Sequence, residues 1–328
     1  MSHAQSRDEP AEHLPLSTVH ELVAAAILAP SMHNTQPWRF HYEPASQTIE
    51  LSADPARMLK FGDPAGRAVH IACGAALLNL RLAVAVAGRQ PVVRLLPDPA
   101  QPLLLAAVRL AGPAQPQPDE IELHAAIAVR RTNRSPFSGR PVPPGILAEL
   151  AEAAQREGAA LHRLDRPETI RLLHLAREAE RQLLRQPGYR AELARWAGGP
   201  RDQDGIPDAA LAPHDPTGMA PVRDFAAAAP APVRYAWFED RPQLAVLATL
   251  SGDRPDWLRA GQALQRVLLT ATLRGIAVSP LTQPLETPDA WLVREPGTGF
   301  DYPQMILRLG YGLPVPASPR RPVSDVLL

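Results

Sequence analysis

The octapeptide Ser-Met-His-Asn-Thr-Gln-Pro-Trp, at residues 31–38, decides the fold of this chain. It follows a run of apolar residues at helical spacing, which predicts a helix over residues 19–29. A helix end with an Asn turn, continued through Gln-Pro into an edge strand, would explain the Asn and the Pro. It gives no reason for the Gln or the Trp. The stretch is therefore predicted to do more than reverse the chain.

A second short motif, Arg-Arg-Thr-Asn-Arg at residues 130–134, lies in the other half of the chain. Its three guanidinium groups are expected at a helix end and the turn after it, where they can bind a phosphate dianion in bidentate fashion. The hydroxyls of Ser31 and Thr132 can donate hydrogen bonds, and Asn34 and Gln36 offer both donors and acceptors. Taken alone, residues 130–134 are better explained as a solvated basic helix end, stabilised by the helix dipole, because basic residues are common at helix ends.

An internal repeat relates the two halves. Residues 74–88 align without gaps to residues 261–275, an offset of 187, with five of fifteen positions identical. A hairpin is expected before each copy and a strand after it. The octapeptide has no counterpart before the expected second hairpin, and the first 18 residues hold only one arginine, Arg7. Each half thus keeps what the other lacks, as in a fused pseudo-dimer with one complete site and one abandoned site.

The two motifs together resemble the flavin-binding signature of the nitroreductase family, whose subunits normally carry both. The resemblance implies an α+β, nitroreductase-like (FMN-dependent) fold in two fused copies that form an intramolecular pseudo-dimer. The chain looks most like the Acg-like single-chain branch of the family, with a lid over one flavin. It implies one FMN per chain, bound between the halves of a monomeric pseudo-dimer.

The resemblance also implies which residues bind the cofactor. In the family, a loop after the central helix offers backbone N–H groups to the flavin, and here that loop is residues 275–283. Arg308 and the basic run at 318–321 resemble the segment that completes the phosphate site, with a solvated tail as an equal alternative for the run. No catalytic side chain and no metal site is expected. The candidate cofactor-binding residues are Pro30, Ser31, Met32, Asn34, Gln36, Arg130, Arg131, Thr132, Arg134, Pro280, Leu281, Thr282, Gln283, Arg320 and Arg321.

Three parts of the chain are distinguished: a mobile arm at 1–15, a first nitroreductase-like half at 16–118, and a second at 119–328 with a lid-like insertion at 186–224. The insertion is rich in Gly, Pro and Asp and is expected to have little regular structure. Ser17 or Thr18 is expected to cap the first helix. Further helices are expected over 66–87, 145–155, 168–184 and 256–274, another ending near residue 130, and strands over 38–42, 48–52, 103–110, 233–238, 243–250 and 305–309.

Composition narrows the classes of function. Lys+Arg and Asp+Glu both number 34, so no nucleic-acid or membrane partner is expected. The one cysteine, Cys73, lies in an apolar run and is expected to be a buried structural thiol. The N-terminus lacks the apolar stretch of a signal peptide, which predicts a cytoplasmic location.

The predicted activity is that of an FMN-dependent NAD(P)H oxidoreductase of nitroreductase type. NADH or NADPH would supply hydride, and a nitroaromatic, quinone or related small molecule would accept it in a ping-pong cycle. The alternative is a flavin-binding or sequestering protein whose lid blocks turnover. A purely structural two-domain protein would require the split motifs to be a coincidence.

Overall fold

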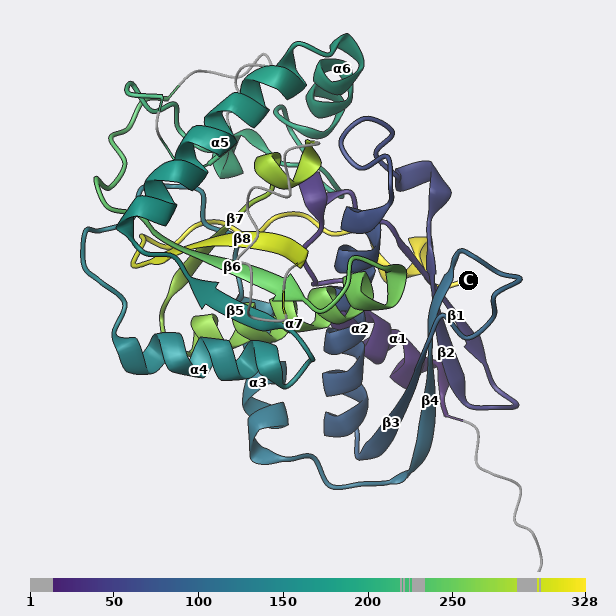
Figure 1. Cartoon of the computed structure of the whole chain (residues 1–328). Helices are drawn as coiled ribbons and strands as arrows, with labels where there is room; N and C mark the ends of the chain where they lie inside the picture. Colours follow the sequence, from purple (N-terminus) through teal and green to yellow (C-terminus); the bar gives the residue numbers. More distant parts are fainter. Residues whose placement is uncertain are drawn as a thin grey trace, which may run out of the picture.

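The computed structural model describes residues 14–218, 220, 222, 223, 225, 234–287, 300 and 302–328. These residues form two four-stranded antiparallel sheets, with helices between and around them (Figure 1). The first sheet has the order β1-β2-β4-β3 and the second β5-β6-β8-β7, so the two orders are the same when each sheet is numbered from its own first strand. The strands are β1 (Trp38–Glu43), β2 (Thr48–Ala53), β3 (Arg89–Leu95), β4 (Leu104–Pro113), β5 (Ala160–Arg163), β6 (Gln243–Thr249), β7 (Ala277–Leu281) and β8 (Tyr302–Gly310).

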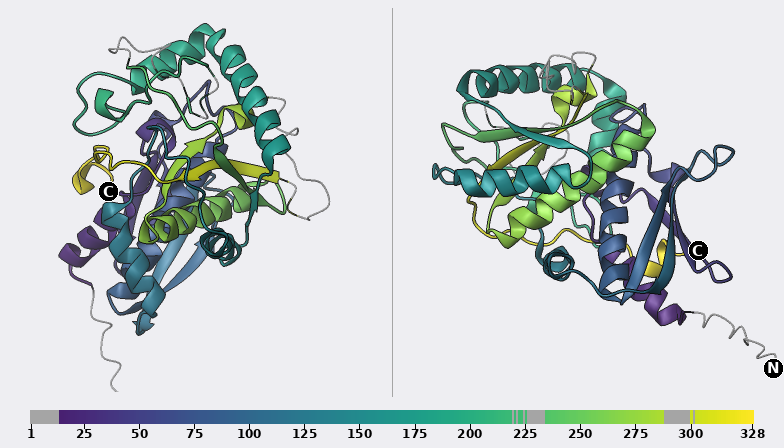
Figure 2. Two further views of the ribbon diagram at one scale, coloured as in Figure 1. Left: turned by 90° about the vertical axis from the view of Figure 1, so that its left-hand side faces the viewer. Right: turned by 60° about the horizontal axis from the view of Figure 1, so that its bottom comes forward.

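The helices repeat the correspondence between the halves. A long helix connects the second and third strands of each sheet: α2 (Arg67–Val86) in the first half and α7 (Arg254–Leu273) in the second. Helices α4 and α5 lie on opposite sides of the second sheet, and α5 and α6 form its outer layer (Figures 1 and 2). The other helices are α1 (Leu16–Ala26), α3 (Pro118–Val129), α4 (Pro144–Gln155), α5 (Arg166–Leu184) and α6 (Pro187–Trp196).

Helices α2 and α7 cross at two glycines. A Cβ added to Gly74 would meet the carbonyl oxygen of Leu258, and one added to Gly261 would meet that of Ile71 and lie 2.8 Å from the Gly74 Cα. Both pairs, 74 with 261 and 71 with 258, are separated by the repeat offset of 187 residues. The contact is therefore reciprocal, as at an interface with twofold symmetry.

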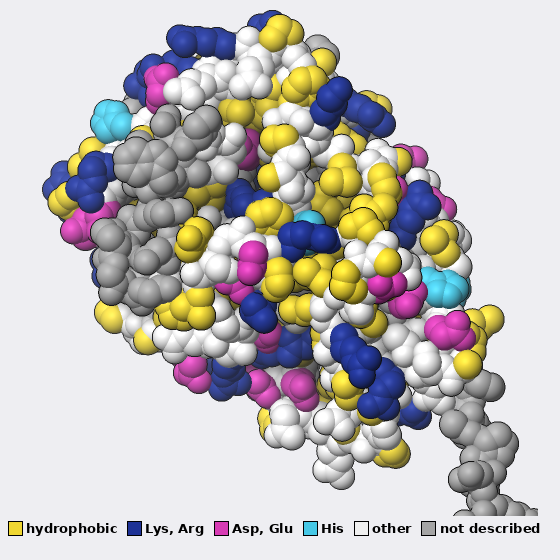
Figure 3. All heavy atoms as spheres, turned by 45° about the vertical axis from the view of Figure 1, so that its right-hand side comes forward, with side chains coloured by type: hydrophobic (Ala, Val, Ile, Leu, Met, Phe, Trp, Pro, Cys, Tyr) yellow, Lys and Arg dark blue, Asp and Glu magenta, His cyan; other side chains and the backbone are white. Residues whose placement is uncertain are grey.

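Helix α2 is long and apolar enough, by length and composition alone, to cross a membrane. In the structure 89% of its apolar window is buried inside the protein, which is the environment of a core helix. On the face shown in Figure 3, basic and acidic side chains are interspersed over the described surface. The cytoplasmic location and the exclusion of nucleic-acid and membrane partners stay predictions.

Most of the expected elements are present, but the start of the first helix was predicted wrongly. Helix α1 begins at Leu16 with Pro15 as its N-cap residue, and no side chain caps it. The fixed φ of proline suits the turn that enters a helix, and the Pro15 carbonyl accepts from the backbone N–H of Thr18 and Val19.

The second half also departs from the sequence-based expectations. Val233 lies outside the described residues, and 234–238 form no strand beyond an isolated bridge from Tyr235 to His214. The strand beside β6 is instead β5, so everything between β5 and β6 interrupts the second sheet. That interruption is not as irregular as expected, because α6 lies inside residues 186–224.

Candidate functional site

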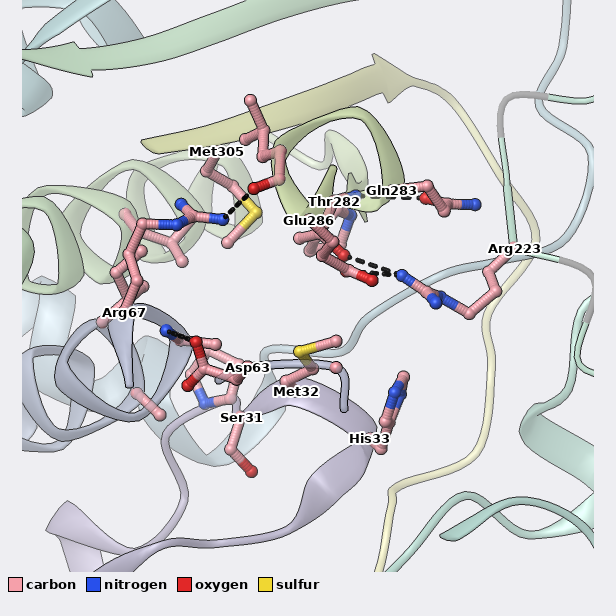
Figure 4. Close-up of a pocket in the computed structure, with 18 of the residues that line it drawn as sticks. Ser31, Met32, His33, Asp63, Arg67, Arg223, Thr282, Gln283, Glu286 and Met305 are labelled. Atoms are coloured by element: carbon pink, nitrogen blue, oxygen red, sulfur yellow. Dashed lines mark hydrogen bonds and ion pairs between the residues drawn. The ribbon is translucent and has the colours of Figure 1, made fainter. Parts of the chain in front are cut away.

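A cavity of about 280 Å³ lies between the two halves. The first half contributes residues 30–33 and the N-terminal end of α2, and the second contributes α7, the end of β7, residues 282–287 and parts of 222–225. Asp63 and Arg67 lie on one side, and on the other Arg223 reaches Glu286 (Figure 4). Both halves of the chain are therefore needed to build it.

The octapeptide forms a tight turn at the cavity wall. His33, Asn34 and Gln36 have positive φ values of 52°, 57° and 50°, a region that side chains with a Cβ seldom adopt. The Ser31 hydroxyl accepts a hydrogen bond of 2.9 Å from the Gln36 backbone N–H and closes the turn. Backbone strain of this kind is often found at ligand sites, where the surrounding structure holds it in place.

A smaller cavity of about 100 Å³ adjoins the first and shares Pro30, Ser31, Thr132 and Arg134 with it. Arg130, Arg131 and Arg320 also line it, so four guanidinium groups converge there. No carboxylate among the described residues lines this cavity or forms an ion pair with any of the four. Such a concentration of one sign of charge favours an anionic ligand.

Arg130 is the most perturbed of these arginines. It is 5% exposed. Among the residues that the structure describes, its Nε has no hydrogen-bond partner and its Nη groups make only long contacts of 3.4 and 3.5 Å, to the Leu28 carbonyl and the Thr132 hydroxyl. Burial, and then the charges of Arg320, Arg131 and Arg134, lower the pKa of Arg130 to about 9. A buried cation with unused donors is costly unless a ligand pairs with it, so this cavity fits a phosphate group.

Comparisons with known proteins identify the family to which the chain belongs. The nitroreductase family model matches residues 127–311. "Putative NAD(P)H nitroreductase Rv3131" of Mycobacterium tuberculosis is 37% identical over 326 residues, covering 96% of this chain and 92% of that protein. "Putative NAD(P)H nitroreductase acg" of the same organism is 33% identical, covering 94% of each. The chain belongs to the nitroreductase family.

The full-length match to acg places this nitroreductase in the Acg-like branch, with the α+β fold of the family. A solved nitroreductase with bound FMN from Desulfitobacterium hafniense covers 62% of this chain and 95% of its own, at 16% identity and a TM-score of 0.38. The assignment rests on the family model and the full-length relatives.

Most of the predicted cofactor-binding residues of this nitroreductase come together. Pro30, Ser31, Met32, Thr132, Arg134, Pro280, Thr282 and Gln283 line the larger cavity, and Asn34, Arg130, Arg131 and Arg320 line the smaller one. Arg320 is no solvated tail. Its guanidinium donates to the carbonyls of residues 27, 28 and 29 at the end of α1, at 2.8 to 3.1 Å.

Three predicted residues lie outside both cavities. Gln36 is fully buried and bonds to the backbone of Gln203 and Arg321. Leu281 packs in an apolar cluster of the second half, and the Arg321 side chain donates to the Asp325 carbonyl. The structure does not bring these three side chains to either cavity, because each has a partner or an apolar environment within the protein, and their contact with the cofactor stays a prediction.

Two other expectations need correction. Residues 277–281 form strand β7 and not a loop, Pro280 has no N–H, and the Thr282 N–H is bonded to the Gln283 side chain. Arg308 is fully buried, lines neither cavity and is not placed to bind a phosphate. Its Nε lies 2.8 Å from Glu239 and its guanidinium stacks on Phe137. The end of β7 still reaches the larger cavity, where the buried Ser279 hydroxyl has no partner among the described residues.

Several polar residues of the larger cavity were missed by the sequence analysis. Arg223 and Glu286 form a buried ion pair of 2.6 Å, and Arg223 also donates to the Thr282 hydroxyl at 3.1 Å. No local sequence pattern predicts them, because Arg223 and Glu286, which ends a short 3-10 helix, are 63 residues apart in the chain. Asp63 could have been found, since it lies just before a predicted helix start and accepts from the N–H groups of Ala68 and Val69. Burial raises the pKa of Asp63 to about 6.

Proposed function

We propose that this nitroreductase is an FMN-dependent oxidoreductase that takes hydride from NADH or NADPH and passes it to a small-molecule acceptor such as a nitroaromatic or a quinone. The observation that carries the proposal is the pair of joined cavities: a small one where four guanidinium groups have no carboxylate partner among the described residues, beside a larger one with mixed apolar and polar walls. A flavin mononucleotide has the same two parts, a phosphate and a ring system. The relatives named as NAD(P)H nitroreductases support the choice of electron donor.

The residues have separate tasks under this proposal. Arg130, Arg131, Arg134 and Thr132 would hold the phosphate, since charge-assisted hydrogen bonds contribute about 1.5–3 kcal/mol each. Ser31, Met32, Pro280, Thr282 and Gln283 would position the ring between the halves. FMN, when bound, supplies the hydride chemistry, so the protein needs no nucleophile of its own. Phe225 and Trp257, which also line the larger cavity, would exclude water.

We further propose that residues 16–118 and 119–328 are fused copies that act as a monomeric pseudo-dimer with one FMN. The reciprocal contact of Gly74 and Gly261 and the shared strand order support this arrangement. Both cavities take walls from both halves, which explains why each half holds only one motif.

A second function is favoured by one observation. Val222 and Arg223, near the end of the lid-like insertion 186–224, and Phe225 just after it form part of the wall of the larger cavity, and Arg223 is fixed there by Glu286. If this segment keeps nicotinamide from the flavin, the protein binds or sequesters FMN without turnover.

One preparation tests both functions. Purified protein should be yellow, and mixing it anaerobically with NADPH or NADH should bleach the flavin band in the reductase. Bound flavin that resists both nucleotides, but is bleached by dithionite, would indicate the sequestering protein. A colourless preparation that fails to bind added FMN would refute both.

A further inference from the structure

Two amide side chains of the octapeptide, Asn34 and Gln36, hold two other segments of the chain together. Asn34 and Gln36 are 7% and 0% exposed. Each bonds on one side to residues 319–321 near the C-terminus and on the other to residues 203–205 of the insertion. We call residues 203–205 the clasp loop.

Asn34 makes the first of these bridges. Its Nδ2 donates to the carbonyls of Gly205, at 2.9 Å, and Pro319, at 3.0 Å. Its Oδ1 accepts from Nη1 of Arg320 at 3.0 Å. The backbone of Gly205 also donates to the Asn34 carbonyl at 3.3 Å. All the hydrogen-bonding capacity of the Nδ2 group is therefore used within the protein.

Gln36 makes the second bridge in the same pattern. Its Nε2 donates to the Gln203 carbonyl at 2.7 Å, and its Oε1 accepts from the backbone N–H of Arg321 at 2.9 Å. A buried amide that loses one of these partners would leave a polar group unsatisfied, at a cost of about 1–3 kcal/mol. The position of the clasp loop and that of residues 319–321 therefore depend on each other.

The C-terminal partner of both bridges borders the smaller cavity. We call it the guanidinium cavity, because Arg130, Arg131, Arg134 and Arg320 line it. Arg320 lies between Pro319 and Arg321, lines that cavity, and is repelled there by Arg131. An anion in the cavity would offset this repulsion and fix Arg320 in place. The path from cavity to clasp loop thus runs through Arg320 and the two amides.

We propose that Asn34 and Gln36 are positioning residues that couple anion binding in the guanidinium cavity to closure of the clasp loop. By linkage, an anion that favours the closed loop is itself held more tightly when the loop is closed. The cofactor is then retained by contacts that do not touch it. This inference rests on the proposed function only in taking FMN as the ligand, because any phosphate that occupies the cavity should act in the same way.

Hydrogen exchange of the peptide spanning residues 201–206 measures loop closure directly. In the wild type, saturating FMN is expected to slow this exchange at least fivefold, and high concentrations of inorganic phosphate should do the same. Gln36→Met keeps the volume but removes the hydrogen bonds to Gln203 and Arg321, together with a longer one of 3.4 Å to the Asn34 carbonyl. Gln36 lies outside both cavities, so FMN should still bind. The ligand-induced slowing should then fall below twofold.

Asp204→Asn is the matched control. Asp204 forms an ion pair of 2.9 Å with Arg57, which holds the clasp loop, and among the described residues no hydrogen bond or ion pair joins Asp204 itself to residues 319–321. The control should speed exchange with and without ligand by the same factor, leaving the ligand-induced ratio at its wild-type value. A purely structural role of Gln36 would give that same result in Gln36→Met.

The outcomes separate the two proposals. If FMN binds by fluorescence titration but neither it nor phosphate slows exchange in the wild type, the coupling is refuted while the proposed function stands. If FMN fails to bind, the proposed function falls and the phosphate response decides the coupling. Equal ligand-induced slowing of exchange in the wild type and in Gln36→Met would also refute the coupling. If Gln36→Met does not fold, Gln36→Ala takes its place in the same comparison.

Discussion

At the scale of single residues, the site combines backbone strain with unpaired charge. His33, Asn34 and Gln36 hold left-handed conformations in the turn of the octapeptide, and Arg130 is buried beside three other guanidinium groups. Both features cost free energy in the unliganded protein. An anionic ligand that pairs with these charges offsets part of the unfavourable free energy. The affinity of the site for that ligand therefore depends on a few side chains.

Arg130→Ala should weaken FMN binding about tenfold to a hundredfold, because it removes a charge-assisted contact of about 1.5–3 kcal/mol. Titration of FMN fluorescence measures the change in Kd. Arg94→Ala removes an equal charge from β3, away from both cavities, and should leave the Kd within twofold of the wild type. Equal weakening in the two variants would show that only net charge matters.

Asp63 makes stability depend on pH in an unusual direction. Burial raises its pKa to about 6 in the folded protein, so the folded state holds this proton more tightly than the unfolded state. Its contribution to the free energy of unfolding must then fall as pH rises through about 4 to 6. Urea unfolding should show the wild type losing about 2 kcal/mol relative to Asp63→Asn between pH 4.5 and 7.5. A difference that stays constant with pH would contradict this assignment.

How much of the site the sequence reveals follows from where each residue lies. Ser31 and Arg134 belong to contiguous motifs whose chemistry can be recognised locally, and both line the larger cavity. Arg223 and Glu286 are brought together only by the fold, and the residues next to each in the sequence do not predict their ion pair. Gln36 was recognised as unusual, but its partners are backbone groups more than a hundred residues away, which no local pattern specifies.

At the scale of elements, the crossing of α2 and α7 holds the two halves together. Gly74→Ala should lower the free energy of unfolding by about 1–3 kcal/mol, because its Cβ would meet the backbone of Leu258, which cannot move aside as a side chain can. Thermal or urea unfolding measures the loss. Gly145→Ala in α4 meets nothing within 4 Å and should be neutral or slightly stabilising. A Gly74→Ala protein as stable as Gly145→Ala would mean that the helices can separate freely.

The elements that sequence reasoning found are the long amphipathic or apolar ones. Helices α2, α5 and α7 have clear periodicity, and strands β1 and β2 flank an evident turn. The short β5 was missed because four residues carry too little pattern. The expected strand at 233–238 was favoured by its β-branched and aromatic residues, yet the place beside β6 is taken by β5, so tertiary pairing overrides propensity.

At the scale of the whole molecule, the proposed fusion of two copies would determine how many FMN molecules one chain can bind. The octapeptide and the guanidinium groups that line the joined cavities are each present in one copy per chain. Residues from both halves line the two cavities. At the repeat-related end of α7, Arg254 donates to His70, and His70 packs edge-on against Trp257. A single chain should therefore complete one site without a partner subunit.

The protein is thus expected to bind one FMN per chain while remaining monomeric. Absorbance at the flavin band against total protein gives the stoichiometry, and native mass spectrometry gives the mass of the same species. Arg130→Ala provides the internal reference. In a chain with a single FMN site, weakening that site should lower the bound fraction toward zero, whereas a chain with two sites would keep about half. A measured value near two FMN per chain, or flavin found only in a dimer, would contradict the pseudo-dimer, because a second site would then exist outside the cavities that the two motifs build.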